Sequence, residues 1–120
     1  MENEIISKEL LSQVFETVKN VEYVECIGNN IFWSGLLYSG LEGNGSINIH
    51  ELAYRCKEWA YKKDFVIYSA RYGNEFGICF LYIDSENPNI LNPCFRIKEN
   101  TEYEAIFQAC EYILKQLSNN

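Results

Sequence analysis

Hydrophobic residues between positions 47 and 63 recur at steps of three and four, which is the spacing of one face of an α-helix. Asn48 is placed to cap this helix, and Glu51 is three residues further on, as in a capping box. Lys62 and Lys63 follow near its end, where the helix dipole favours cations. The pattern predicts an amphipathic core helix. Its apolar stripe consists of Ile49, Leu52, Ala53, Cys56, Trp59 and Ala60.

Two further helices are predicted towards the ends of the chain. Ser7 is a favoured N-cap, and the apolar positions after it keep helical spacing as far as Val18, with Lys19 suited to the end of the helix. Thr101 and Glu104 have the spacing of a second capping box, which predicts a terminal helix.

The segments between these helices favour β-strands. Two β-rich runs, 21–27 and 31–38, flank a Gly-Asn-Asn sequence and predict a hairpin. Two more, 65–72 and 75–84, flank Gly73 and Asn74, which fit a two-residue type II′ turn. Both prolines fall within 85–93, which predicts a loop before a short edge strand at 94–98.

Residues 39–46 contain three glycines and are predicted to form a mobile loop. A glycine-rich loop before a helix invites comparison with phosphate-binding loops. The segment lacks the Walker lysine, matches neither nucleotide fingerprint, and carries Glu42, which would repel phosphate. The comparison therefore fails.

The element order is α-β-β-α-β-β-(β)-α, with the optional strand at 94–98. It predicts an α+β fold in which two β-hairpins form an antiparallel sheet with three helices. A chain of 120 residues that is 48% hydrophobic suits a single domain, 1–120.

Charge and composition exclude several functions. The net charge of −7 disfavours direct binding of nucleic acid, whose phosphates most of this surface would repel. No apolar run is long enough for a membrane span, and the acidic amino terminus is unlike a signal peptide. We therefore expect a cytoplasmic protein that does not insert into membranes.

Candidate chemistry is sparse. The five cysteines contain no C-x-x-C pair and are expected to be free, buried thiols, and His50 is the only histidine. We therefore predict no metal, no cofactor and no catalytic residues. Tyr68, Arg71 and Tyr72 could form a base-stacking platform, but the acidic balance argues against it.

Two segments carry a resemblance to other proteins. N-I-H-E-L-A-Y-R-C-K-E-W-A at 48–60 and E-A-I-F-Q-A-C at 104–110 are similar to matching helices of a group of small uncharacterised phage and prophage proteins. The match covers about half the chain. It implies an accessory protein of a phage or a prophage-bearing bacterium, and it implies no activity.

These observations predict a non-enzymatic protein that acts by binding another protein. Eighteen aromatic residues exceed what one small core hides, and surplus aromatics are typical of interfaces. One version is an acidic inhibitor of a host-defence or nucleic-acid-binding protein, which it would bind through Glu16, Glu22, Glu25 and Glu42. The alternatives are a ligand-binding protein or enzyme with a pocket near residues 40–46, and a structural homodimer.

Overall fold

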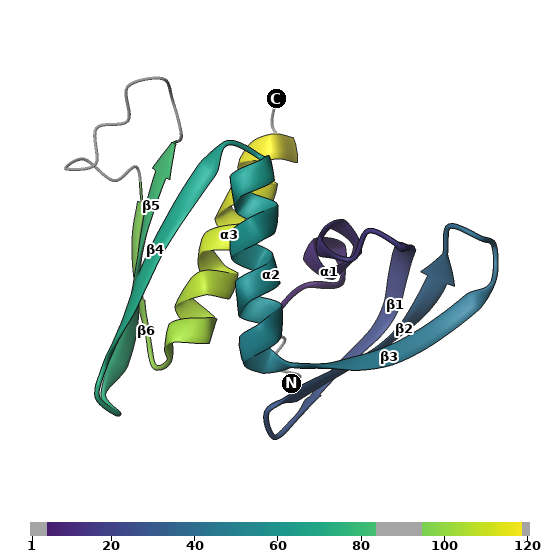
Figure 1. The fold of residues 1–120 in the computed structure, drawn as a ribbon, viewed down its shortest axis with the longest axis horizontal. Helices are drawn as coiled ribbons and strands as arrows, with labels where there is room; N and C mark the ends of the chain where they lie inside the picture. Colours follow the sequence, from purple (N-terminus) through teal and green to yellow (C-terminus); the bar gives the residue numbers. More distant parts are fainter. Residues whose placement is uncertain (1–4, 84–94, 119–120) are drawn as a thin grey trace. The chain divides into compact units, whose positions relative to one another are not determined.

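The computed structural model describes residues 5–83 and 95–118 (Figure 1). This part of the chain contains three helices and two three-stranded antiparallel sheets, so the predicted α+β class is confirmed. None of the described helices is long and apolar enough to cross a membrane. The elements are α1 (Lys8–Val14), β1 (Val18–Ile27), β2 (Asn30–Leu37), β3 (Glu42–Asn48), α2 (Ile49–Lys62), β4 (Phe65–Tyr72), β5 (Phe76–Ile83), β6 (Phe95–Glu99) and α3 (Glu102–Ser118).

The chain divides into two compact units, Met1–Leu52 and Ala53–Asn120. The first contains α1 and the sheet β1-β2-β3, and the second contains the sheet β4-β5-β6 and α3. Helix α2 begins in the first unit and continues into the second. The single domain remains a prediction.

In the first unit, α1 starts as predicted but ends earlier. The Leu10 N–H donates to Ser7 Oγ at 3.1 Å, which confirms the N-cap. The helix stops at Val14, and Val18 already belongs to β1, so the predicted continuation to Val18 is wrong. The reason is a turn after the helix, in which the Val18 N–H donates to the Phe15 carbonyl at 3.2 Å. This turn buries Phe15 and Val18 three residues apart and so imitates helical spacing.

The predicted glycine-rich loop is largely a strand, which corrects the expectation for 39–46. Gly40 does lie in the turn, with φ 90°, but β3 begins at Glu42. Gly45 pairs with Trp33, whose indole nitrogen would lie 3.2 Å from a Cβ added to Gly45. The glycines in β3 thus leave room for side chains of β2, and the aromatic ring compensates for the side chain that glycine lacks.

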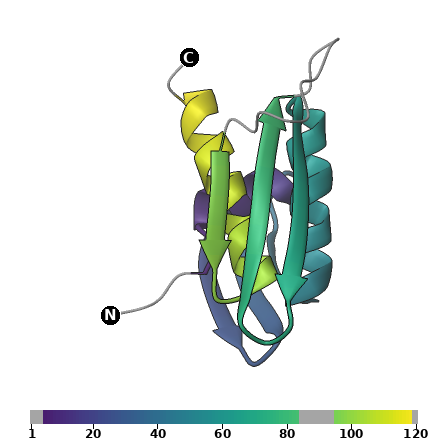
Figure 2. The ribbon, with the colours of Figure 1, turned by 90° about the vertical axis from the view of Figure 1, so that its left-hand side faces the viewer.

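In the second unit, α3 packs on one face of β4-β5-β6, and in Figure 2 the sheet lies in front of this helix. The side chains of Ile67, Cys79, Leu81 and Ile97 are buried on this inner face. The predicted N-cap at Thr101 is present, because the Glu104 N–H donates to Thr101 Oγ1 at 3.2 Å. The Thr101 hydroxyl in turn donates to Glu104 Oε1 at 2.8 Å. The α3 residues buried in the core are Ala105, Ile106, Phe107, Ala109, Cys110 and Ile113.

The connections of this sheet differ from the prediction in detail. Tyr72 pairs with Phe76, so the hairpin turn has three residues, 73–75, and the predicted two-residue turn is wrong. Gly73 has φ 55°, and the Glu75 N–H donates to the Tyr72 carbonyl at 3.0 Å, which closes this longer turn. The predicted edge strand is present as β6, and the loop predicted for 85–93 lies outside the described residues.

Candidate binding face on the second sheet

The face of β4-β5-β6 that is turned away from α3 is accessible to solvent, and we call it the outer face. Side chains alternate along each strand, and residues paired across strands share a face, so the register assigns its members. None of them is buried. They are Val66, Tyr68, Ala70, Tyr72, Phe76, Ile78, Phe80, Tyr82, Arg96 and Lys98.

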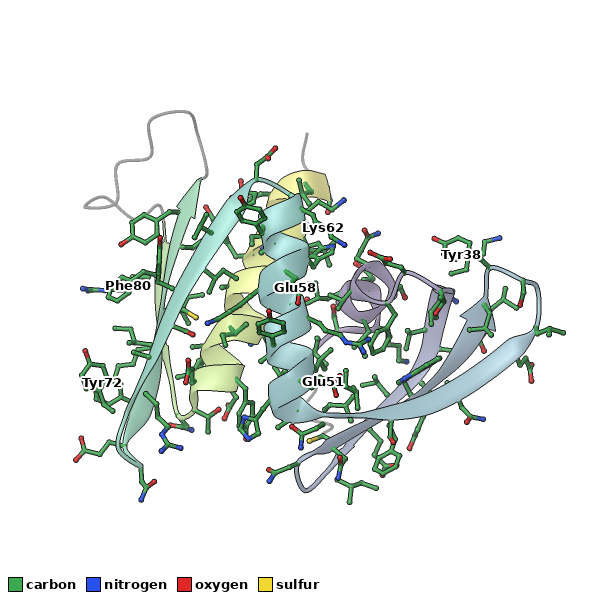
Figure 3. The ribbon with its side chains drawn as sticks, in the orientation of Figure 1. Tyr38, Glu51, Glu58, Lys62, Tyr72 and Phe80 are labelled. Carbon is green, nitrogen blue, oxygen red and sulfur yellow. The ribbon has the colours of Figure 1, made fainter. Side chains whose placement is uncertain are left out.

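Aromatic rings dominate the outer face and contact one another. Tyr68 meets Tyr82 edge-on with ring centroids 5.4 Å apart, and Tyr72 stacks on Phe76 at 4.7 Å. Tyr68 and Tyr72 remain 51% and 54% exposed. Figure 3 shows Tyr72 and Phe80 pointing away from α3. The face therefore presents preformed pairs of rings to whatever contacts it.

The charge of the outer face is opposite to that of the protein. Its two charged side chains are Arg96 and Lys98, and none of its members is acidic. Because the whole chain has a charge of −7 and this face has +2, the other residues together carry −9. Lys98 Nζ lies 4.2 Å from the centre of the Phe76 ring, which is a cation–π contact.

Contacts on the inner face hold this surface in place. The Ser69 hydroxyl donates to Glu102 Oε2 at 2.6 Å, which ties β4 to the first turn of α3. Gly77 lies against the backbone of Thr101 and Glu102, where a Cβ would overlap these atoms. The outer face is thus built on a sheet that is fixed to a capped helix.

The structure separates the three residues considered as a base-stacking platform. Tyr68 and Tyr72 share the outer face, as residues four positions apart in a strand must. Arg71 pairs with Gly77 and belongs to the opposite face. The cations that accompany the tyrosines are instead those of β6.

The four glutamates predicted to bind a partner are all exposed, but they occupy different settings in the first unit. Glu16 lies in the turn after α1, and Glu22 lies at an irregularity of β1 between Val21 and Tyr23. Glu25 pairs with Phe32, and Glu42 pairs with Leu36, so these two share a sheet face near opposite ends of β2. The structure does not gather the four carboxylates into one cluster.

A shallow hollow of about 420 Å³ lies on the solvent face of β1-β2-β3, and the end of the segment 40–46, which was predicted to border a pocket, forms part of its lining. Its lining includes no histidine, cysteine, carboxylate, lysine or arginine. These residues offer no pairing of a nucleophile with a base. The lining residues are Tyr23, Phe32, Trp33, Ser34, Asn44, Gly45 and Ser46.

The described thiols fall into two groups. Cys26 is exposed, whereas Cys56, Cys79 and Cys110 are buried. Burial raises the pKa of Cys79 to about 12. A hydrogen bond with Cys56, together with burial, raises the pKa of Cys110 well above its usual value. The thiols of Cys79 and Cys110 therefore remain protonated at neutral pH. All three buried cysteines pack as small apolar side chains.

His50 lies in the first turn of α2, where its backbone N–H donates to Asn48 Oδ1 at 2.9 Å and confirms the predicted cap. Within residues 5–83 and 95–118, no group of three or more histidine, cysteine or carboxylate side chains could hold a metal ion.

Sequence reasoning missed most of the outer face. The run from Phe76 to Ile83 is apolar at almost every position, a pattern that favours a strand covered on one face and in part on the other. The available signal was β6, where Arg96 and Lys98 alternate with buried Ile97. That alternation indicates a strand with one solvent face, and neighbouring strands share that face.

The chain was also compared with known proteins. No family model matches the sequence, and no curated protein or solved structure matches it. The candidate site therefore rests on the geometry described above.

Proposed function

We propose that this chain is a non-enzymatic binding module and that the outer face is the surface that binds a protein. The observation that carries the proposal is the outer face itself, which presents aromatic rings and two cations without a carboxylate in a strongly acidic chain. The chemistry of the face fits a partner that places carboxylates around an apolar patch.

The composition of the outer face resembles the centre of a protein interface. Tyrosine, phenylalanine and arginine are enriched at such centres, and the residues that contribute most to binding are drawn from them. The tyrosines here are already paired with neighbouring rings, so binding would immobilise fewer free side chains. This favours a stable contact with a folded or extended polypeptide.

Nucleic acid fits the outer face less well. Binding to a phosphate backbone relies on several cations, and this face supplies two. Base stacking needs open ring faces, but Phe76 is in contact with both Tyr72 and Lys98. The remaining charge of the chain would also repel phosphate. We therefore propose no direct nucleic-acid ligand.

The setting that we propose follows from the sequence. The resemblance to phage and prophage proteins supports an accessory protein in the cytoplasm of a bacterium, where a host or phage protein is the partner. Inhibition of a host-defence protein is one role that such binding would serve. Binding to a basic nucleic-acid-binding protein through Glu16, Glu22, Glu25 and Glu42 would use a different surface, in the first unit.

The test compares paired tyrosine variants. Tyr68→Thr/Tyr82→Thr removes two contacting rings from the outer face. The control is Tyr54→Gln/Tyr61→Gln, which removes two tyrosines of α2 that are 65% and 63% exposed. Each tagged protein is used to capture partners from host lysate, and the eluates are compared by quantitative mass spectrometry.

The proposal predicts that a captured protein is lost with the outer-face variant and retained with the control. Thermal unfolding of both variants checks that they remain folded. Equal capture by the wild type and both variants would overturn the proposed binding face.

A further inference from the structure

A second surface feature adjoins the outer face. A hollow of about 470 Å³ lies between β6 and α3, within the second unit. Its lining contains four consecutive residues of β6, Arg96 to Glu99. Side chains of consecutive strand residues point to opposite faces, so a single hollow can touch all four only along the hydrogen-bonding edge of the strand. The hollow therefore follows the edge of β6 that is turned away from β5.

Helix α3 forms the other wall of this hollow. Gln108, Glu111, Tyr112 and Lys115 have the spacing i, i+3, i+4, i+7, so they lie on one side of the helix. The hollow thus has a strand edge on one side and a helix side on the other.

In the sheet order β4-β5-β6, the described residues pair β6 on one side only. An edge strand presents alternate N–H and C=O groups that a further strand can pair with. A groove between an edge strand and a helix is the setting in which extended peptides bind by adding a strand.

We propose that an extended segment of the partner binds in this groove as an additional strand on β6. The inference rests on the proposed function, because it takes the ligand to be a protein, and it specifies which part of that protein is recognised. The contact with β6 would extend the sheet, and the outer face would continue onto the added strand.

Charge defines the sequence of this segment. Arg96 and Lys98 occupy the outer face of β6, so cross-strand neighbours on that face favour carboxylates. Residues on the other face would lie beside buried Ile97 and would be apolar or small. We therefore infer a segment in which acidic residues alternate with apolar ones. The groove also contains Glu99 and Glu111, which do not attract carboxylates. The preference for acidic residues therefore comes from Arg96 and Lys98 on the outer face.

A second copy of the chain is a poorer occupant. Antiparallel pairing of two β6 strands about their centre, Ile97, would place Arg96 opposite Lys98 of the second copy. Like charges in direct cross-strand positions are destabilising. Charged side chains on an edge strand are also a common defence against such self-pairing.

The test uses two synthetic libraries of eight-residue peptides with the full-length chain. Glutamate alternates with a varied residue in one library, and lysine does so in the other. We expect the tightest glutamate peptides to bind about tenfold more strongly than the matching lysine peptides. The variant Arg96→Glu/Lys98→Glu should reverse this preference, while Lys62→Glu/Lys63→Glu, which makes the same change of charge on exposed positions, should keep it.

Two further measurements identify the mode of binding. N-methylation of alternate backbone amides in the best peptide should weaken binding about tenfold when those amides face β6. Hydrogen exchange of the bound chain should slow at 96–99. Absence of binding from both libraries, an unchanged preference in the Arg96→Glu/Lys98→Glu variant, protection of β4 in place of β6, or a dimer protected at 96–99 without peptide would overturn the inference.

The outcomes also separate this inference from the proposed function. If peptides fail to bind but the Tyr68→Thr/Tyr82→Thr variant loses its captured protein, strand addition is wrong and the binding face stands. If peptides bind at β6 but the Tyr68→Thr/Tyr82→Thr variant captures the same protein as the wild type, strand addition at β6 is supported and the outer face is not the surface that binds this protein.

Discussion

The hydroxyl of Ser69 in β4 donates a hydrogen bond to Glu102 Oε2 in α3 at 2.6 Å, across 33 positions of sequence. The contact is partly buried, and it joins the middle of the edge strand to the first turn of the helix that supports the sheet. The geometry of the outer face depends on contacts of this kind.

Replacing Ser69 by alanine should lower the free energy of unfolding by about 1–2 kcal/mol, because the partly buried hydrogen bond is lost. Chemical denaturation of the variant measures this change. Ser39→Ala, at an exposed turn position, should change the free energy of unfolding by less than about 0.5 kcal/mol. Equal effects of the two substitutions would mean that the Ser69 contact does not support the sheet.

Gly77→Ala should destabilise the protein more than any other glycine substitution within β3 or β5. An added Cβ would overlap the backbone of Glu102, which cannot move without disturbing the start of α3. We expect a loss of about 2–3 kcal/mol. Gly43→Ala is the comparison, because its Cβ would meet the flexible Leu37 side chain at 2.8 Å. A milder effect at Gly77 than at Gly43 would contradict the close approach of β5 to α3.

The buried thiol of Cys79 makes the stability of the protein depend on pH in the alkaline range. The pKa of Cys79 is about 12 in the folded protein and 9.0 for an unperturbed thiol, so the unfolded chain releases this proton first. The stabilisation is complete below pH 9 and is lost as the pH rises from 9 towards 12. Chemical denaturation at pH 8 and pH 10.5 measures the free energy of unfolding at each pH. Between these two values it should decrease less for Cys79→Ala than for the wild type. An identical decrease would contradict the raised pKa.

Reactivity gives an independent check on the thiols. At pH 8 an alkylating reagent should modify Cys26 first among the described cysteines, and Cys56, Cys79 and Cys110 only after unfolding. Peptide mapping by mass spectrometry measures the order of modification. Rapid alkylation of Cys110 in the native protein would show that the core of the second unit is open.

Neutralising the four glutamates of the first unit tests the acidic-inhibitor hypothesis. The variant with glutamine at Glu16, Glu22, Glu25 and Glu42 should retain the partner that the outer face captures, because these side chains belong to other surfaces. The measurement is the affinity of this variant and of the wild type for the captured protein, at low and at high salt. A steep loss of affinity would instead support binding through the acidic residues.

The helix starts were predictable because caps are local. Asn48 and Thr101 form their hydrogen bonds with residues two or three positions away, so a short sequence window contains both partners. The end of α1 was not predictable in this way. Its apparent continuation comes from Phe15 and Val18, which a turn after the helix buries three residues apart, as one more helical turn would.

Strand β3 and the outer face depend on partners far away in the sequence. Gly45 is accommodated in a strand because Trp33 lies opposite it. The residues next to Gly45 in the sequence do not indicate this pairing. The exposed side of β5 is decided by where α3 packs. Residues of β6 complete the outer face. Their charge can be assigned to this face only when the register is known, because the register places Arg96 beside Phe80 and Lys98 beside Ile78.

The most direct test of the binding face is charge reversal with quantitative capture. Wild type, Arg96→Glu/Lys98→Glu and Lys62→Glu/Lys63→Glu are compared in the same host lysate at two salt concentrations. If the outer face binds a partner that carries carboxylates, the first variant loses the captured protein, the second retains it, and salt weakens wild-type capture. Retention of the same protein by the Arg96→Glu/Lys98→Glu variant would contradict the account.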